Sequence, residues 1–428
     1  MYINIAKVDF GRCYSGPGGG EEVEEYYGMY ITTASDSAIS VIPNENYYNL
    51  HSKYLKYSFD GKTWNDWNNS VSIEPEQKMY LKGEDDYVWN SSTSGKLITS
   101  SGYYNVGGDI SSLTNEIVEV KDYTFYSLFY SDSYIKDCSN LILPATTLAN
   151  RCYSNMFKGC TTLTTAPELP ATTLANYCYQ YMFHGCASLT TAPELPATTL
   201  YDSCYSNMFL VCTSLTTAPE LPATTLVNSC YSKMFNRCTS LTTAPELPAT
   251  TLADYCYYAM FDGCTSLTTA PELPATTLVN SCYKSMFQDC TSLTAAPELP
   301  ANTLTDYCYY NMFHGCTSLT TAPELPATTL ADDCYQYMFQ GCSSLTSAPE
   351  LPANTLTYYC YFNMFYGCSN LNSITMLATD ISASGCLLNW VNGVSSKGTF
   401  TKSPEMTSLP TGQNGIPSGW TVVDYGAA

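Results

Sequence analysis

One stretch decides the fold of this chain: residues 169–194 read Leu-Pro-Ala-Thr-Thr-Leu-Ala-Asn-Tyr-Cys-Tyr-Gln-Tyr-Met-Phe-His-Gly-Cys-Ala-Ser-Leu-Thr-Thr-Ala-Pro-Glu. Nine close copies of these 26 residues follow one another. Their first cysteines stand at 152, 178, 204, 230, 256, 282, 308, 334 and 360. Such a period is typical of a solenoid, in which each unit buries its apolar side by stacking on its neighbours. The sequence therefore predicts an elongated repeat array.

Apolar residues within the unit recur at every fourth position. Leu174, Cys178, Met182 and Cys186 form this stripe with Phe183 beside it, a pattern typical of a helix. The remainder, Ser-Leu-Thr-Thr-Ala-Pro-Glu-Leu-Pro, is β-branched and broken by proline, which favours one short strand and two turns. We therefore expect an α/β solenoid of leucine-rich-repeat type, with a strand and a helix of about three turns in each unit.

The same unit predicts how the array closes and curves. Thr172 or Thr173 is placed to cap the start of the helix, and Gly185 to end it in a left-handed conformation. Stacked strands lie about 4.8 Å apart, whereas packed helices need about 8–10 Å. We therefore expect an arc with its helices on the outside.

The repeats account for all but three of the 21 cysteines, the exceptions being Cys13, Cys138 and Cys386. Two cysteines eight residues apart on a helix are separated by about 12 Å, beyond the roughly 7 Å that a disulfide tolerates. Equivalent cysteines on neighbouring helices are also expected to be too far apart. We therefore expect free thiols that pack as small buried apolar groups, which fits folding in a reducing compartment.

The charge balance excludes several classes of partner. The chain has 17 Lys and Arg against 38 Asp and Glu, a net charge of −21, which repels nucleic acid and anionic membranes. Residues 1–10 lack the basic and apolar regions of a secretion signal, and no later stretch suits a membrane span. We expect a protein that folds first in the cytosol and then acts in a virion, outside the cell or at a cell surface.

The repeat blocks resemble a known family. The pattern Cys-Tyr-x-x-Met-Phe-x-Gly-Cys-Thr-Ser-Leu-Thr-Thr-Ala-Pro-Glu-Leu-Pro-Ala-Thr-Thr-Leu, over roughly residues 126–372, is similar to the BspA-like class of leucine-rich repeats, found in surface proteins of gut bacteria and in proteins of their phages. Residues 57–64 with 79–83, and residues 385–390 with 415–420, look like the usual companion domains of these repeats. The resemblance implies adhesion or ligand binding, without catalysis.

Four segments are predicted along the chain. Residues 1–45, with the Gly-rich acidic stretch 16–25, form an arm for attachment. Residues 46–125 form a small β-rich domain that contains an Asp60-Gly61 hairpin turn. The solenoid covers 126–372, including a degenerate first repeat, and residues 373–428 form a C-terminal cap with Trp390 and Trp420 in its core.

The positions that vary among the repeats predict a binding surface. With the first cysteine as position 0 and 100° per residue, the invariant residues fall on one side of the helix and positions −1, +2, +3 and +6 on the other. Tyr, Ser, Asn, Asp and Gln dominate there, which is typical of adaptable recognition surfaces, although drift of exposed positions is the alternative. The candidate ligand-binding residues are Tyr177, Gln180, Tyr181, His184, Tyr255, Tyr258, Tyr307, Tyr310, Tyr337 and Tyr359.

Few residues suit catalysis or metal binding. His184 and His314 occupy the same repeat position five units apart, so they share no site, and no Ser-His-Asp or metal-ligand spacing is present. We expect no enzymatic activity and no cofactor. A column of glutamates, including Glu194, Glu220, Glu246 and Glu272, would stand about 5 Å apart on consecutive strands. We expect these carboxylates to be solvated at the edge of the solenoid, and calcium binding is the alternative hypothesis.

These observations predict a non-enzymatic adhesin, a receptor-binding component of a phage or prophage-derived particle of the tail-fibre kind. Its partners would be a host-surface glycan or protein, other structural proteins of the particle through the N-terminal region, and further copies of the same chain in a homo-oligomer. A bacterial surface or secreted adhesin is the first alternative. A structural spacer is the second.

Overall fold

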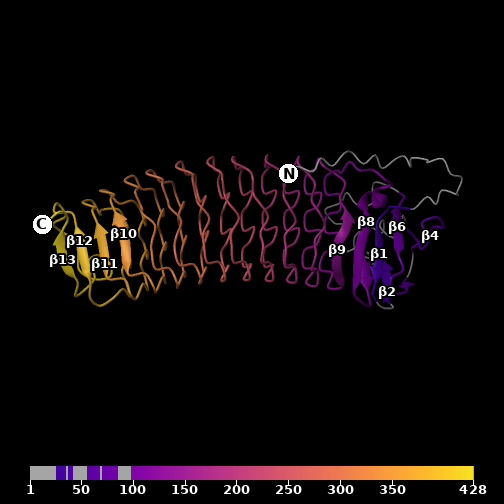
Figure 1. Ribbon diagram of the computed structural model, residues 1–428. Coiled ribbons are helices and arrows are strands. Elements are labelled where there is room, and N and C mark those ends of the chain that lie inside the picture. The colour runs from indigo at the N-terminus through magenta and orange to yellow at the C-terminus, as the bar shows by residue number, and fades with distance from the viewer. Residues whose placement is uncertain (1–25, 35–36, 42–54, 68–69, 85–97, 428) are drawn as a thin grey trace, which may run out of the picture.

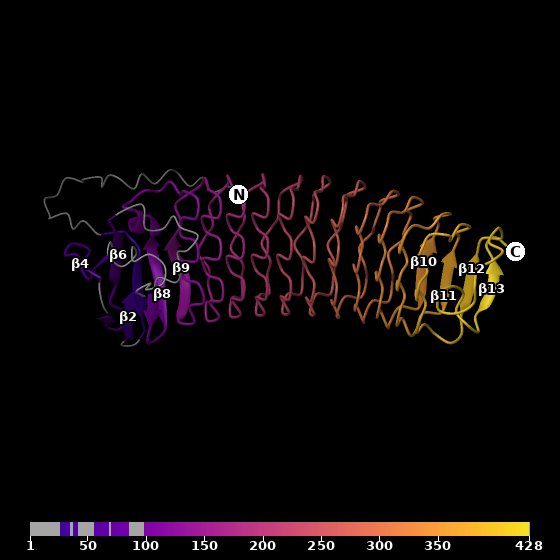
Figure 2. The ribbon, with the colours of Figure 1, turned by 180° about the vertical axis from the view of Figure 1, so that it is seen from behind.

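The computed structural model describes residues 26–34, 37–41, 55–67, 70–84 and 98–427. Within them the repeats form coils stacked in single file, with a β-sheet region at the N-terminal end and a smaller sheet at the C-terminal end (Figure 1). The view from behind shows the same order and only a gentle bend (Figure 2). The predicted repeat solenoid is confirmed.

The N-terminal region is built from short strands and one 3-10 helix. They are β1 (Tyr30–Thr33), β2 (Ser37–Val41), β3 (Leu55–Ser58), β4 (Asn65–Asp66), β5 (Val71–Ile73), β6 (Met79–Gly83), β7 (Ile98–Ser100), β8 (Tyr104–Asp109) and η3 (Ile110–Thr114). Strands β1 and β2 lie in the segment predicted as an arm, whose residues 1–25 fall outside the described part of the chain. The predicted hairpin turn joins β3 to β4, with Gly61 left-handed and the Asp60 carboxylate accepting the N–H groups of Lys62 and Thr63.

The N-terminal sheet runs directly into the solenoid. Its strand order is β4-β3-β6-β1-β8-β9, and a separate sheet has the order β5-β2-β7. Strand β9 (Ile135–Ile142) belongs to the degenerate first repeat and pairs in parallel with β8. The next repeat follows it at once, since the Cys138 N–H donates to the Thr165 carbonyl at 3.0 Å. The β-rich region therefore covers the first open edge of the stack.

Proline limits the strand in the central repeats. There the Leu-Thr-Thr-Ala-Pro-Glu-Leu-Pro segment forms single parallel bridges, such as Thr191 to Thr217 and Thr243 to Thr269, because proline lacks the N–H that would extend the ladder. Full strands appear at the ends of the array, although β10 still contains Pro349 and its register with β11 shifts between Ser347 and Glu350. At the C-terminal end β10 (Ser347–Leu351), β11 (Ser373–Met376), β12 (Thr399–Lys402) and β13 (Thr421–Asp424) form a parallel sheet in that order.

The helix predicted for each repeat does not form. Residues 174–186 make overlapping β-turns instead, in which the N–H of Cys178, Gln180, Met182, His184 and Cys186 each donates to the carbonyl three residues earlier, at 3.0–3.3 Å. Every residue between these donors faces the next repeat. The N–H groups of Tyr177, Tyr179, Tyr181, Phe183 and Gly185 donate to carbonyls of residues 202–210 at 2.8–3.1 Å. Both sides of each coil are therefore tied to the next coil by backbone hydrogen bonds.

These turns need a left-handed residue at every fourth position. Tyr177, Tyr181 and Gly185 have φ of 60°, 58° and 74°, and the equivalent residues of the other repeats are also left-handed. A non-glycine residue pays about 1–2 kcal/mol for this conformation. The hydrogen bonds between repeats offset that cost. Gly185 is left-handed as predicted, but as a turn residue within the stack.

Two columns of stacked rings fill the core. The Phe column runs from Phe129 to Phe365 with ring centroids 5.2–5.7 Å apart. The Tyr column runs from Phe125 to Tyr361 with centroids 5.8–6.1 Å apart. This spacing is much closer to that of stacked strands than to that of packed helices, so the helix spacing behind the predicted arc and the cysteine distances does not apply.

The cysteines of the repeats are free and buried, as predicted. Each second cysteine has a polar role as well, because its thiol donates to the phenylalanine carbonyl of the preceding repeat. Cys186 donates to Phe157 at 3.1 Å and Cys264 to Phe235 at 3.0 Å. A small side chain with a weak donor fits a site that lies between two closely spaced coils.

Two tryptophans close the C-terminal end of the core. Trp390 is fully buried under Tyr361, with its indole N–H donating to the Gly415 carbonyl at 2.9 Å. Trp420 exposes 7% of its surface and donates to the Ser395 carbonyl at 2.7 Å. Both predicted core positions of the cap are confirmed.

Replacing Gly341 with alanine tests the left-handed conformation of this position. Gly341 has φ of 76°, and an added methyl group would meet only Gly315 at 3.8 Å. We expect the free energy of unfolding to fall by about 1 kcal/mol, because alanine is strained in the left-handed region. Asparagine should cost less. Urea unfolding of the full chain measures the difference, and a Gly341→Ala variant as stable as the wild type would contradict the left-handed conformation of this residue.

Raising the pH should unfold the solenoid abruptly. Burial raises the pKa of Cys152, Cys204 and Cys282 to about 12, whereas an unfolded thiol titrates near about 8.5. The unfolded chain therefore loses protons first, and stability falls as pH rises from about 8.5 towards 12, by about 1.4 kcal/mol per pH unit and thiol. Because the effects of all the repeat cysteines add, we expect the chain to unfold at about pH 9–10. Circular dichroism measures this unfolding. A fold that persists at pH 11 while its thiols react freely would overturn this expectation.

Candidate functional site

The turn segment of each repeat has an inner and an outer side. With the first cysteine as position 0, the residues at 0, +1, +4, +5 and +8 are buried in every repeat. Large side chains at −1, +2, +3 and +6 are at least partly exposed on most repeats, whereas small ones such as Ser154 and Asn207 are covered by their neighbours. Two residues in every four therefore reach the outer side, and they are the ones that vary.

The ten residues predicted to bind ligand all lie on this outer side, and none of them is buried. Tyr255 and Tyr307 are the most exposed of the ten, at 45% and 38%. The others are half-buried against neighbouring repeats. These are Tyr177, Gln180, Tyr181, His184, Tyr258, Tyr310, Tyr337 and Tyr359.

Repeats 7 to 9, counted from the repeat of Cys152, bring several rings together in one group, here called the aromatic cluster. Its members are Tyr307, Tyr310, Tyr337, Tyr358, Tyr359 and Phe362. The ring centroids are 5.8 Å apart from Tyr307 to Tyr310, 5.5 Å from Tyr310 to Tyr337 and 5.1 Å from Tyr337 to Phe362. Tyr359 lies 5.1 Å from Phe362 and 4.3 Å from Tyr358. The cluster therefore spans three consecutive coils without a break.

Two members of the aromatic cluster were not predicted. Phe362 stands at position +2, which the sequence marks as variable, and its equivalents in repeats 5 and 7 are Tyr258 and Tyr310. Tyr358 stands at position −2, where the other repeats carry Asn or Asp. This replacement is the sequence feature that could have identified Tyr358, which is 47% exposed.

The remaining predicted residues form smaller, separate groups. Tyr181 packs on His184 in repeat 2 with centroids 5.6 Å apart, and Tyr255 packs on Tyr258 in repeat 5 at 6.0 Å. Repeats 3 and 4 lie between them and carry Ser, Asn, Leu and Lys at the outer positions. The structure thus brings the predicted residues together in three places along the array.

Basic side chains lie over several of these rings. Arg151 lies 4.0 Å from the Tyr177 ring centroid, and Lys158 lies 4.7 Å from that of Tyr181. Lys284 lies 5.0 Å from the Tyr307 centroid and 4.5 Å from that of Tyr310. Each cation comes from the repeat before its tyrosine. Such contacts contribute about 0.5–1 kcal/mol each at an exposed site.

The two histidines of the repeats, His184 and His314, are both half-buried. Burial lowers the pKa of both His184 and His314, with Lys158 adding to the effect on His184 and Asp289 opposing it on His314. Both stand at position +6, and five repeats at strand spacing separate them by about 24 Å. The structure does not bring them together, so they cannot act as a catalytic pair.

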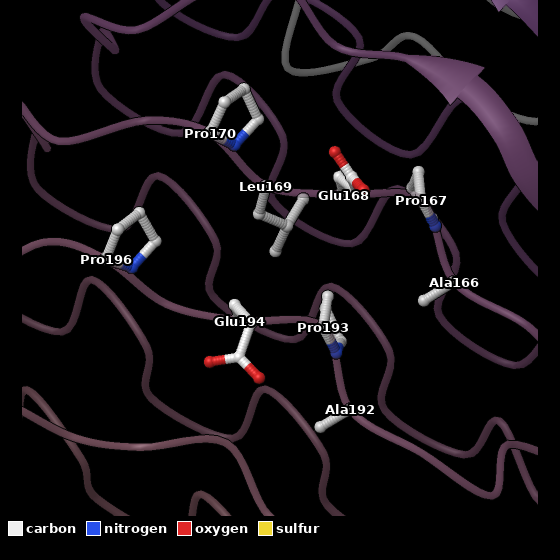
Figure 3. Close-up of a pocket in the computed structure, with 9 residues that line it drawn as sticks. All are labelled: Ala166, Pro167, Glu168, Leu169, Pro170, Ala192, Pro193, Glu194 and Pro196. Atoms are coloured by element: carbon white, nitrogen blue, oxygen red, sulfur yellow. The ribbon is translucent and has the colours of Figure 1, made fainter. Parts of the chain in front are cut away.

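The glutamates at position +16 form an exposed column on the proline-rich side of the coils. All eight, from Glu168 to Glu350, are exposed. Figure 3 shows Glu168 and Glu194 beside a shallow groove lined by Pro167, Leu169 and Pro193, with the Glu194 carboxylate pointing away from Glu168. Calcium binding by this column stays a hypothesis.

Two further features bear on the class of site. Across the described ranges, no three His, Cys, Asp or Glu side chains gather in an arrangement that could hold a metal ion. In the same part of the chain, no helix has the length and apolar character needed to cross a bilayer.

Comparison with known proteins identifies the repeats. The family described as the BspA type leucine-rich repeat region matches in six copies, over residues 96–268, 228–354 and 255–385. These matches together cover residues 96–385, well over half of the chain. No curated protein matches it. The chain therefore belongs to the family of BspA-type leucine-rich-repeat proteins.

Proposed function

We propose that this chain is a non-enzymatic attachment protein of a phage or prophage-derived particle, which binds a glycan or protein on the host surface through the outer residues of its repeats. Leucine-rich-repeat proteins are generally non-enzymatic binding scaffolds, and the BspA type suggests a surface-binding, adhesin-like role. The N-terminal region would join the chain to the other structural proteins of the particle. The same outer residues would serve a bacterial surface adhesin.

One observation carries the proposal: the positions that vary among the repeats are the ones whose side chains face solvent. The buried Cys, Tyr, Met, Phe and Cys positions are the same in all nine copies, whereas the outer positions change and collect tyrosine. Tyrosine offers a large amphipathic contact area at a low entropic cost, which suits recognition. Unselected exposed positions would more often carry Lys, Glu or Arg.

The free thiols support folding inside the producing cell. The structure describes 20 cysteines, all free and buried. A chain with so many thiols would be prone to disulfide formation if it were exported unfolded into an oxidising space. A protein that folds in the cytosol and leaves in an assembled particle avoids that step. This observation favours a particle component over a secreted adhesin.

Removing the outer tyrosines should abolish attachment without unfolding the chain. The quadruple variant replaces Tyr177, Tyr255, Tyr307 and Tyr359, all at position −1, with serine, the residue that repeats 3, 4 and 6 carry there in the same left-handed conformation. We expect a thermal midpoint that falls slightly, because Tyr177 and Tyr307 lose their contacts with Arg151 and Lys284. Binding to bacterial cells should be lost, measured with labelled protein by flow cytometry on a panel of gut bacteria.

The matched control is a quadruple Glu→Gln variant of the glutamate column, at Glu194, Glu220, Glu246 and Glu272. It changes four exposed residues on the other side of the coils and should bind cells as the wild type does. If the tyrosine variant still binds cells fully, the repeats act as a spacer and the proposal fails.

A further inference from the structure

In the part of the chain that the structure describes, lysine and arginine side chains lie over tyrosine rings in the first part of the repeat array but not in its last part. Arg151, Lys158, Lys233 and Lys284 each lie over an outer tyrosine of the following repeat, and these tyrosines belong to repeats 2, 5 and 7. These rings therefore already hold an ammonium or guanidinium group. Outer tyrosine rings of this solenoid therefore bind cationic nitrogen groups within the chain itself.

The C-terminal repeats have rings but no cations. No Lys or Arg occurs from residue 285 to 396, whereas Asp and Glu occur eight times in that stretch. The aromatic cluster lies within it, and among the described residues no cation lies over the rings of Tyr337, Tyr358 or Tyr359. Only its first two members, Tyr307 and Tyr310, are covered, by Lys284. The C-terminal part of the cluster, with Tyr337, Tyr358 and Tyr359, therefore has outer tyrosine rings like those of the earlier repeats but no basic side chain from the described ranges over them.

Three carboxylates border the cluster. An Asp306 carboxylate oxygen accepts the Asp332 N–H at 3.2 Å, and an Asp332 oxygen accepts the Tyr358 N–H at 3.1 Å, so both are fixed beside the rings and exposed. Asp333 is 7% exposed and lies against Tyr307. Burial raises the pKa of Asp333 and the Tyr307 hydroxyl opposes this by hydrogen bonding to it, while the Asp333 charge raises the pKa of Tyr307.

We propose that the aromatic cluster, together with Asp306 and Asp332, binds lysine or arginine side chains of a protein on the host surface. This inference rests on the proposed binding function and names the partner class for its C-terminal site. The incoming cation lies over the rings of Tyr337, Tyr358 and Tyr359, as Arg151 lies over Tyr177 and Lys284 over Tyr307. The two exposed carboxylates accept hydrogen bonds from the incoming ammonium or guanidinium group.

The choice of partner follows from charge and hydrogen bonding. A region with eight acidic and no basic residues complements a basic segment, and cationic groups gain both ring contact and ion pairing there. A quaternary ammonium group would use the rings but leave the carboxylates without hydrogen bonds. A neutral sugar would gain nothing from the charge.

The test is binding of a labelled twelve-residue peptide of alternating Lys and Gly to the full chain, by fluorescence anisotropy at fixed salt. Tyr337→Leu and Asp332→Asn should each weaken binding about fivefold or more, which is within the range of a cation–π contact or charge-assisted hydrogen bond. The same peptide with every lysine acetylated should not bind.

Matched controls come from the earlier repeats. Tyr181→Leu changes the same position, +3, with the same left-handed backbone, but its ring already carries Lys158. Asp202→Asn removes one charge at the same position, −2, as Asp332→Asn. Both should bind the peptide within about twofold of the wild type, since a twofold change is about 0.4 kcal/mol.

The outcomes separate the inference from the proposed function. Equal losses in test and control variants would mean that the peptide responds only to the net charge of −21, and the inference would be wrong. Binding of the acetylated peptide, or of a neutral glycan that depends on Tyr337, would also overturn it. In either case, cell attachment lost on serine replacement at position −1 would leave the proposed function standing.

Discussion

The structure depends on one arrangement of backbone hydrogen bonds. In every turn segment, alternate N–H groups close a turn within the coil, and the others donate to the next coil, as Tyr179 does to Cys204 at 3.0 Å. This satisfies the buried backbone on a side of the solenoid that has no helix and no regular strand. It also fixes the spacing between repeats at that of a β-sheet. The side chains in the core and those on the outer side of each coil must then pack at that spacing.

The core follows from the spacing. Side chains at one repeat position lie directly over their counterparts, so flat rings stack face to face, and the Phe column keeps its centroids within 5.2–5.7 Å. A cysteine at +8 fits between coils where a larger residue would not, and its thiol satisfies a phenylalanine carbonyl. These contacts and the hydrogen bonds between coils together offset the cost of the left-handed residues other than glycine. A substitution that suits one repeat must therefore also suit its two neighbours.

The sequence predicted the solenoid, its buried stripe and the role of Trp390, because period and apolar pattern depend on side chains alone. It could not show directly that the stripe is not helical. A strict period of four, however, drifts by about 40° per step on a helix of 100° per residue, or about 120° from Leu174 to Cys186. The turns have a true period of four, so their buried face does not drift. The same period explains why the outer positions were assigned to the right side despite the wrong element.

The candidate site shows the limit of sequence reasoning more sharply. On neighbouring helices, about 8–10 Å apart, Tyr310, Tyr337 and Phe362 would belong to three separate surfaces. At strand spacing their rings meet at 5.1–5.5 Å and become one surface. Because the step between coils is so short, a cation in one repeat can cover a tyrosine in the next, and a run of repeats without cations leaves its rings open together. The binding properties of such an array are therefore set by the order of its repeats as much as by the residues in any one of them.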